Sequence, residues 1–105
     1  MKITLTYAVV LGGLLGISNA AMADMELVKQ RGCTGCHALD KKVVGPAFKD
    51  VASKYAGDAT AHAKLVKKVK LGGKGVWGQA AMPASSPRVP DADIEKMVTF
   101  ILSIK

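Results

Sequence analysis

Cys33-Thr34-Gly35-Cys36-His37 is the stretch that decides the fold and chemistry of this chain. On a helical turn, residues i and i+3 point the same way, and residue i+4 lies beside them. Two thiols one turn apart can therefore reach the two vinyl groups on one edge of a porphyrin, and the imidazole that follows lies under the iron. The spacing predicts one haem c, covalently attached through Cys33 and Cys36, with His37 as an iron ligand.

Other uses of two cysteines explain the chain less well. A thioredoxin-like dithiol has the same C-x-x-C spacing, but it belongs to a βαβ framework, and the sequence has no strand pattern. A zinc site needs four ligands. Cys33, Cys36 and His62 supply three, and His37 follows Cys36 too directly to complete the tetrahedron. A disulfide between residues three apart would close a very small loop and restrain little of the chain.

Residues 1–23 have the order of a secretory signal peptide: a positive end, an apolar run over residues 8–17, and small residues that include Ala21-Met22-Ala23. The apolar run is about half of the ~20 residues that span a bilayer, so an uncleaved membrane anchor is the weaker alternative. Cleavage before Asp24 would leave one domain, residues 24–105, which we expect to be exported. A domain of that size usually needs a staple, a metal or a cofactor.

The whole chain carries a formal net charge of +7 at pH 7. Such a charge suits an acidic protein, a nucleic acid or an anionic membrane. Export argues against nucleic acid, as does the lack of aromatic residues interleaved with the lysines. No segment after the signal peptide is apolar enough for stable membrane insertion. We therefore expect redox partner proteins with an acidic docking surface. A basic rim of Lys41, Lys42 and Lys74 would face them, with ordinary solubilising lysines as the alternative.

Apolar periodicity predicts an all-α domain of about four short helices. Pro46 is expected to open the second helix, since a missing N–H is harmless in a first turn. Asp58 is expected to cap the third. Residues 72–90 are rich in glycine and proline and form a long loop, which in so small a domain indicates function. The expected helices are 25–32, 46–57, 58–72 and 91–104.

The second axial position on the iron has four candidate ligands: Met25, Met82, Met97 and His62. Met97 falls on the apolar stripe of the last helix, which favours core packing. Met25 lies at the frayed N-terminus, and His62 is expected to be a packed or surface histidine. Met82 lies in the long loop, outside any helical stripe, where Pro83 favours an extended backbone. Met82 is therefore the predicted ligand.

The sequence resembles the short bacterial monohaem class I cytochromes c over residues 24–105. Four pieces carry the resemblance by their order and spacing: Gly32-Cys33-Thr34-Gly35-Cys36-His37, Val44-Gly45-Pro46-Ala47-Phe48, Gly75-Val76-Trp77-Gly78 and Met82-Pro83. It implies the cytochrome c fold, in which the helices wrap one haem and the long loop brings Met82 to the iron.

The resemblance also implies roles around the haem. The carbonyl of Pro46 would accept a hydrogen bond from His37 Nδ1, which fixes the ring and its tautomer. Trp77 would direct its indole N–H to a haem propionate, and Lys68 would help to neutralise one. Without the resemblance, Trp77 would be expected in the core and Lys68 on a solvated face.

The chain departs from the family after Met82. Ala84 stands where a second proline is frequent, and the stretch 84–89 looks about two residues longer than usual. An asparagine that can hydrogen-bond the axial sulphur is absent there, and Ser85 and Ser86 are the polar residues in its place.

These features predict a monomeric electron carrier rather than an enzyme. It would take one electron from a quinol-oxidising complex or another cytochrome and pass it to a reductase or oxidase. A haem enzyme or gas-binding protein with an open distal site is the alternative if Met82 is not bound to iron. A structural or maturation subunit of a larger complex is a third possibility.

Overall fold

The computed structural model describes residues 19–105, and within this range the chain is helical, with no β-strand beyond two isolated bridges. The predicted all-α class is therefore confirmed. In chain order the elements are α1 (Asn19–Gln30), a 3-10 turn η1 (Cys33–Gly35), α2 (Phe48–Lys54), α3 (Ala61–Leu71) and α4 (Asp91–Leu102). Among residues 19–105, no helix has both the length and the apolar character needed to cross a membrane.

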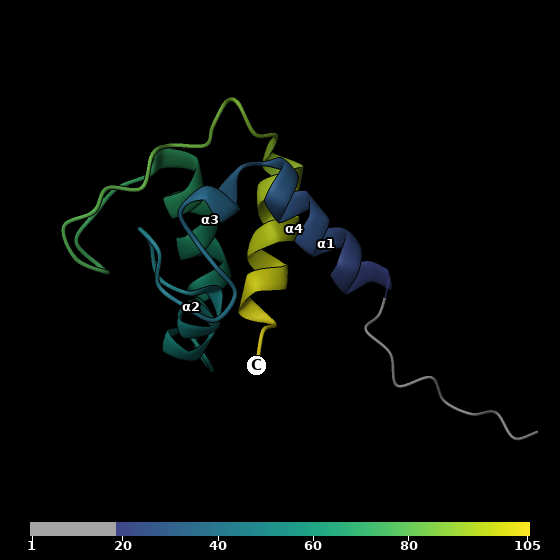
Figure 1. Cartoon of the computed structure of the whole chain (residues 1–105), viewed down its shortest axis with the longest axis horizontal. Helices are drawn as coiled ribbons and strands as arrows, with labels where there is room; N and C mark the ends of the chain where they lie inside the picture. Colours follow the sequence, from purple (N-terminus) through teal and green to yellow (C-terminus); the bar gives the residue numbers. More distant parts are fainter. Residues whose placement is uncertain (1–18) are drawn as a thin grey trace, which may run out of the picture.

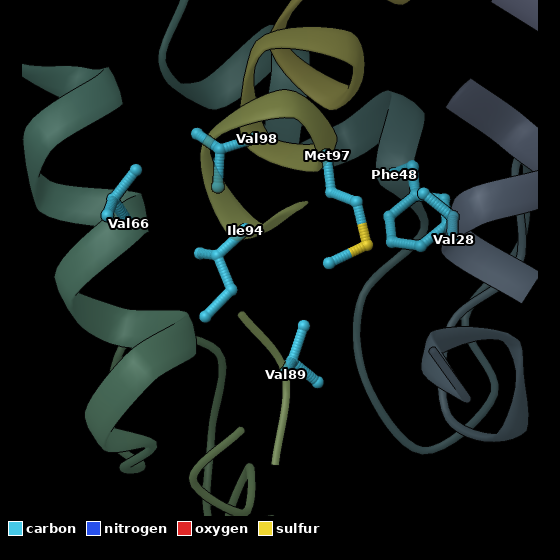
Figure 2. Close-up of a cluster of buried hydrophobic side chains, with 7 residues drawn as sticks. All are labelled: Val28, Phe48, Val66, Val89, Ile94, Met97 and Val98. Carbon is cyan, nitrogen blue, oxygen red and sulfur yellow. The ribbon is translucent and has the colours of Figure 1, made fainter. Parts of the chain in front are cut away.

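Helix α4 is the central element, because α1, α2 and α3 all pack against it (Figure 1). Its apolar stripe buries Ile94, Met97 and Val98, as the sequence predicts. Figure 2 shows these side chains meeting Val66 on one side and Phe48 and Val28 on the other. The core is thus one small cluster, made of Val28, Phe48, Val66, Val89, Ile94, Met97 and Val98.

Helix α2 begins at Phe48 and not at Pro46, which corrects the predicted start. The first N–H groups of a helix have no partner within it. Here the Phe48 N–H donates to the Ala38 carbonyl at 2.9 Å and the Lys49 N–H donates to the Leu39 carbonyl at 3.0 Å. Tertiary contacts therefore set the start of α2, and they also fasten the segment that follows the C-x-x-C-H motif to this helix.

The N-cap of α3 is Thr60 and not Asp58, which corrects the prediction. The Asp58 carboxylate accepts hydrogen bonds from the Thr60 backbone N–H at 2.8 Å and the Thr60 hydroxyl at 2.6 Å. These bonds hold the pKa of Asp58 below its usual value, because they stabilise the charged form. Asp58 therefore stabilises the turn before α3 rather than its first helical turn.

The outer ends of α1 and α4 also differ from the sequence prediction. Helix α1 is already helical at Asn19, the first described residue, rather than beginning at Met25, and α4 stops at Leu102 rather than Ile104. The alanine-rich stretch before Asp24 has high helix propensity, which explains why the helix includes residues ahead of Met25. Residues 1–18 of the predicted signal peptide lie outside the described residues, so the signal peptide stays a prediction.

An ion pair joins α1 to α4 just before the haem-attachment motif. Arg31 Nη2 lies 2.6 Å from Asp93 Oδ2, and Nε lies 3.1 Å from the same oxygen. Both side chains are partly buried. The pair holds the end of α1, and with it the entry to η1, against the first turn of α4.

Candidate functional site

One cavity collects the chemistry-bearing residues. It encloses about 1150 Å³, counting its open mouth, and α2, α3, α4, η1 and the long loop contribute to its walls. In Figure 1 the long loop is the green segment that connects α3 to α4. All seven residues predicted to bind haem line it: Cys33, Cys36, His37, Pro46, Lys68, Trp77 and Met82.

The two cysteines lie on one tight helical turn, as the spacing predicts. The Cys33 carbonyl accepts hydrogen bonds from both the Cys36 N–H, at 3.2 Å, and the His37 N–H, at 3.0 Å. Gly32, in the left-handed conformation with φ +82°, lets the chain turn from α1 into this motif. Partial burial raises the pKa of the Cys33 thiol. The turn therefore presents both thiols and the imidazole to the same cavity.

The His37 ring is held on several sides. Its Nδ1 lies 2.8 Å from the Pro46 carbonyl oxygen, the contact that the resemblance implies. A carbonyl only accepts, so Nδ1 carries the proton and Nε2 keeps a free lone pair. The Phe48 ring stacks on the imidazole with centroids 5.1 Å apart. Gly45 packs so closely that a Cβ there would lie 2.8 Å from Nδ1.

Met82 reaches the same cavity from the loop between α3 and α4, and it is half-buried. Its backbone forms a two-bond bridge with Gly73: the Met82 N–H donates to the Gly73 carbonyl at 2.8 Å, and the Gly73 N–H donates to the Met82 carbonyl at 2.9 Å. Met82 is therefore fixed beside the C-terminal end of α3.

The other candidate ligands lie elsewhere or have another role. Met97 is 3% exposed and packs in the core, as predicted, although its side chain also reaches the cavity wall. His62 is on the surface, outside the cavity, with Nε2 3.1 Å from the Thr99 hydroxyl. Met25 lies on α1 and does not line the cavity. Met82 is thus the methionine that enters the cavity from a loop.

Trp77 and Lys68 both line the cavity. Trp77 is 40% exposed, so the core position expected from the sequence alone is wrong. The Lys54 ammonium lies 5.4 Å from the centre of the indole ring, a cation–π contact that joins α2 to the loop. Lys68 is half-buried rather than solvated. Both side chains offer N–H donors to whatever fills the cavity.

The predicted basic rim is only partly at the cavity. Lys74 lines it, whereas Lys41 and Lys42 are exposed and lie outside its lining. The backbone of Lys42 pairs with that of His37 in an isolated bridge, which keeps this lysine close to the motif.

Sequence reasoning missed how closely glycines border the two predicted ligands. In the sequence, Gly45 stands out only as part of a motif, Gly72 only as the last residue of the expected helix 58–72, and Gly73 only as part of the long loop. A Cβ on Gly72 would overlap the Met82 carbonyl oxygen and lie 2.7 Å from the Ala84 nitrogen. Two adjacent glycines before a long loop indicate a close approach of two backbone segments. The sequence does not show that the second segment is the one that carries Met82.

The cavity fits a haem. Residues from η1, three helices and the long loop surround it, so that thiols, an imidazole and a thioether share one apolar hollow. Its walls are predominantly apolar and include Val44 and Val76, both about half exposed in the polypeptide. The thiols of Cys33 and Cys36 lie on one wall. The lining also includes the His37 imidazole and the Met82 thioether, and both groups are suited to bind haem iron.

Comparisons with known proteins identify the family of this chain. The family model for cytochrome c matches residues 25–105. The chain is 50% identical to cytochrome c-551 of Allochromatium vinosum over 88 residues, 84% of this chain and 93% of that protein. It is 49% identical to cytochrome c-552 of Hydrogenobacter thermophilus over the full length of both.

A solved structure shows the same fold. The crystal structure of Nitrosomonas europaea cytochrome c552 superposes with a TM-score of 0.73 at 44% identity, covering 77% of this chain and 99% of that one. The chain therefore belongs to the cytochrome c family: it is an electron-carrier cytochrome, not an enzyme, with one haem c bound covalently through Cys33 and Cys36.

Proposed function

We propose that this protein is a periplasmic one-electron carrier whose haem iron is bound by His37 on one side and Met82 on the other. The observation that supports the ligand pair is their shared cavity. The imidazole follows the cysteine turn, and the thioether comes from a loop more than forty residues further along the chain. The two cysteines on the same wall would fix the haem edge between them.

The contacts of the His37 ring suit it to this role. The Pro46 carbonyl accepts a hydrogen bond from Nδ1–H, so Nε2 is the nitrogen available to iron. The stacked Phe48 ring and the close Gly45 backbone restrict rotation of the imidazole. A ligand oriented in this way needs little reorganisation when the iron changes charge.

Met82 supplies the property that separates a carrier from an enzyme. Haem c, when bound, supplies an iron that gains or loses one electron. A thioether in the remaining position leaves no site for substrate, and it favours a higher reduction potential than a second imidazole would. The apolar walls exclude water and disfavour additional positive charge.

Trp77 and Lys68 are proposed to meet the haem propionates. An indole N–H and an ammonium are the polar donors suited to carboxylates in a largely apolar wall, and both line the cavity. The cation–π contact with Lys54 would hold Trp77 in reach while leaving the indole N–H free to donate.

The proposed setting is the bacterial periplasm, reached by cleavage of residues 1–23. The donor would be a quinol-oxidising complex or another cytochrome, and the acceptor a reductase or oxidase. The positive charge of the chain supports an acidic docking surface on these partners. Lys74 lines the cavity, and Lys41 and Lys42 follow the C-x-x-C-H motif by a few residues. Such charges act mainly on association rate. The carrier itself is proposed to be a monomer.

Substitution of the two cavity methionines tests the ligand pair. Met82→Ala is expected to abolish the methionine–iron charge-transfer band of the ferric protein and to lower its potential. Met97→Leu, a nearly volume-conserving core change, is the control and is expected to leave the band in place. A band that survives in Met82→Ala would disprove the ligation.

The same purified protein tests export and the alternative function. The intact mass is expected to equal residues 24–105 plus one haem. If wild-type protein instead lacks the methionine band and readily binds carbon monoxide or nitric oxide, the open distal site of a gas-binding protein or enzyme replaces the carrier proposal.

A further inference from the structure

We infer that Gly72, together with the carbonyls at the C-terminal end of α3, positions Met82 over the cavity. This inference rests on the proposed His37/Met82 ligation. Helix α3 would then have a second role besides packing on α4, because its end would serve as the anchor for the ligand-bearing segment.

The first part of the anchor is the bridge between Gly73 and Met82. Two hydrogen bonds, of 2.8 and 2.9 Å, join their backbones in antiparallel fashion. Gly73 follows α3 by only two residues. The Met82 backbone is therefore tied to a point fixed by the helix, and not only to its own loop.

The second part uses carbonyls that α3 cannot satisfy itself. The last four carbonyls of a helix have no partner within it. Here the Val69 carbonyl accepts from the Ser85 N–H at 3.0 Å, and the Lys70 carbonyl accepts from the Ser86 N–H at 3.3 Å. Ser85 is only 9% exposed, so this contact is shielded from water. The chain is thus anchored to α3 at Met82 and again three and four residues later.

Gly72 is the residue that makes this close approach possible. Its φ of +70° and ψ of −165° lie in a region that residues with a side chain rarely adopt. A Cβ there would overlap the Met82 carbonyl oxygen, and it would lie 2.7 Å from the Ala84 nitrogen and 2.9 Å from the Pro83 carbonyl carbon. All three neighbours are backbone atoms, so relief requires the backbone of Met82 to Ala84, or that of Gly72 which adjoins it, to shift.

The intervening residues, 74–81, lie outside the anchor. The Gly73–Met82 bridge closes this excursion at its base, and a separate hydrogen bond from the Gly75 N–H to the Gly78 carbonyl, 3.0 Å, forms its tip. Added Cβ atoms on Gly75 and Gly78 would meet no atom within 4 Å. Changes at the tip should therefore leave the position of Met82 intact.

A matched pair of alanine substitutions separates positioning from backbone strain. Gly72→Ala and Gly57→Ala both introduce a side chain at a positive φ, +70° and +77° respectively, but the Cβ at Gly57 would meet open space. Gly72→Ala is expected to lose the methionine–iron band at neutral pH and to lower the potential. Gly57→Ala is expected to keep both at wild-type values, and the loop-tip variant Gly78→Ala, which also places a side chain at a positive φ (+112°), is expected to keep the band.

The outcomes distinguish this inference from the proposed ligation. If Met82→Ala keeps the band, the ligation itself is wrong. If Met82→Ala loses the band while Gly72→Ala retains it as Gly57→Ala does, the ligation stands and the positioning role of Gly72 is overturned.

Hydrogen exchange decides the question if Gly72→Ala does not fold. In the wild-type haem protein, the amides of Gly73, Met82 and Ser85 are expected to exchange about tenfold or more slowly than exposed amides within residues 74–81. Equal exchange rates in the two groups would show that no separate anchor exists, and would overturn the inference.

Discussion

Gly45→Ala isolates the contact that orients His37. Gly45 does not have a positive φ, so alanine introduces no backbone strain. The added Cβ would lie 2.5 Å from Cε1, 2.8 Å from Nδ1 and 3.0 Å from Nε2 of His37. Separations this short cannot persist, so either the ring or the Gly45 backbone must shift.

The magnitude follows from two opposing effects. Replacing glycine where alanine's conformation is allowed stabilises by about 0.4–1 kcal/mol through the unfolded state. Overpacking costs about 1–3 kcal/mol. If the ring moves instead, it loses the Pro46 hydrogen bond, worth about 0.5–1.5 kcal/mol, and the Phe48 stack, worth about 0.5–1.5 kcal/mol. The net expected loss is about 1–2 kcal/mol, or a fall in Tm of roughly 4–16 °C for a domain of this size.

Thermal unfolding and redox titration measure the two consequences. A weaker Nδ1–H donation makes the imidazole a poorer electron donor, so the potential of Gly45→Ala is expected to rise. Val43→Ala is the control, because Val43 is 48% exposed and lies outside the cavity lining, and it should change stability by about 0.5 kcal/mol or less. A Gly45→Ala protein that is more stable than wild type, with an unchanged potential, would refute the reasoning.

Three further predictions concern stability. Asp58→Asn should destabilise the protein at neutral pH. The lowered pKa of Asp58, due first to the Thr60 hydroxyl, means that this stabilisation is present above the unfolded pKa of about 4 and is lost as pH falls through the folded value. The Tm difference from wild type should therefore shrink in acid, and a constant difference would contradict the assignment. Arg31→Gln should lower stability by about 1 kcal/mol in urea unfolding, since its partner Asp93 is partly buried, and added salt should reduce the difference; no effect at low salt would argue against the pair. Ile94→Val removes one methylene from a fully buried side chain and should cost about 0.5–1.5 kcal/mol, and a neutral result would indicate that the site collapses.

Local pattern was enough to predict the class of fold and the haem-attachment turn. The apolar stripe that buries Ile94 and Met97 follows from helical periodicity alone. The same reasoning separated Met97, a core residue, from Met82, which has no place in a stripe. The spacing of Cys33 and Cys36 is likewise local, because a single helical turn is enough to place both thiols on the same side.

Helix boundaries were predicted less well because partners distant in sequence set them. Helix α2 starts where its N–H groups find the Ala38 and Leu39 carbonyls, and no local signal shows those partners. Thr60, not Asp58, became the N-cap of α3 because the aspartate closes a turn ahead of the helix. Trp77 could not be assigned from its size alone, since a large aromatic side chain serves equally in a core or at a cavity mouth.

The sequence by itself determined which atoms could bind a haem, because thiols, imidazole and thioether are properties of single residues and their short spacings. Only the tertiary structure decided how these atoms are held. The contact of Gly45 with His37 and that of Gly72 with Met82 join segments that meet only after the chain has folded. Steric exclusion acts between atoms in space, so the need for a missing Cβ at these two glycines becomes visible only once their neighbours are in place.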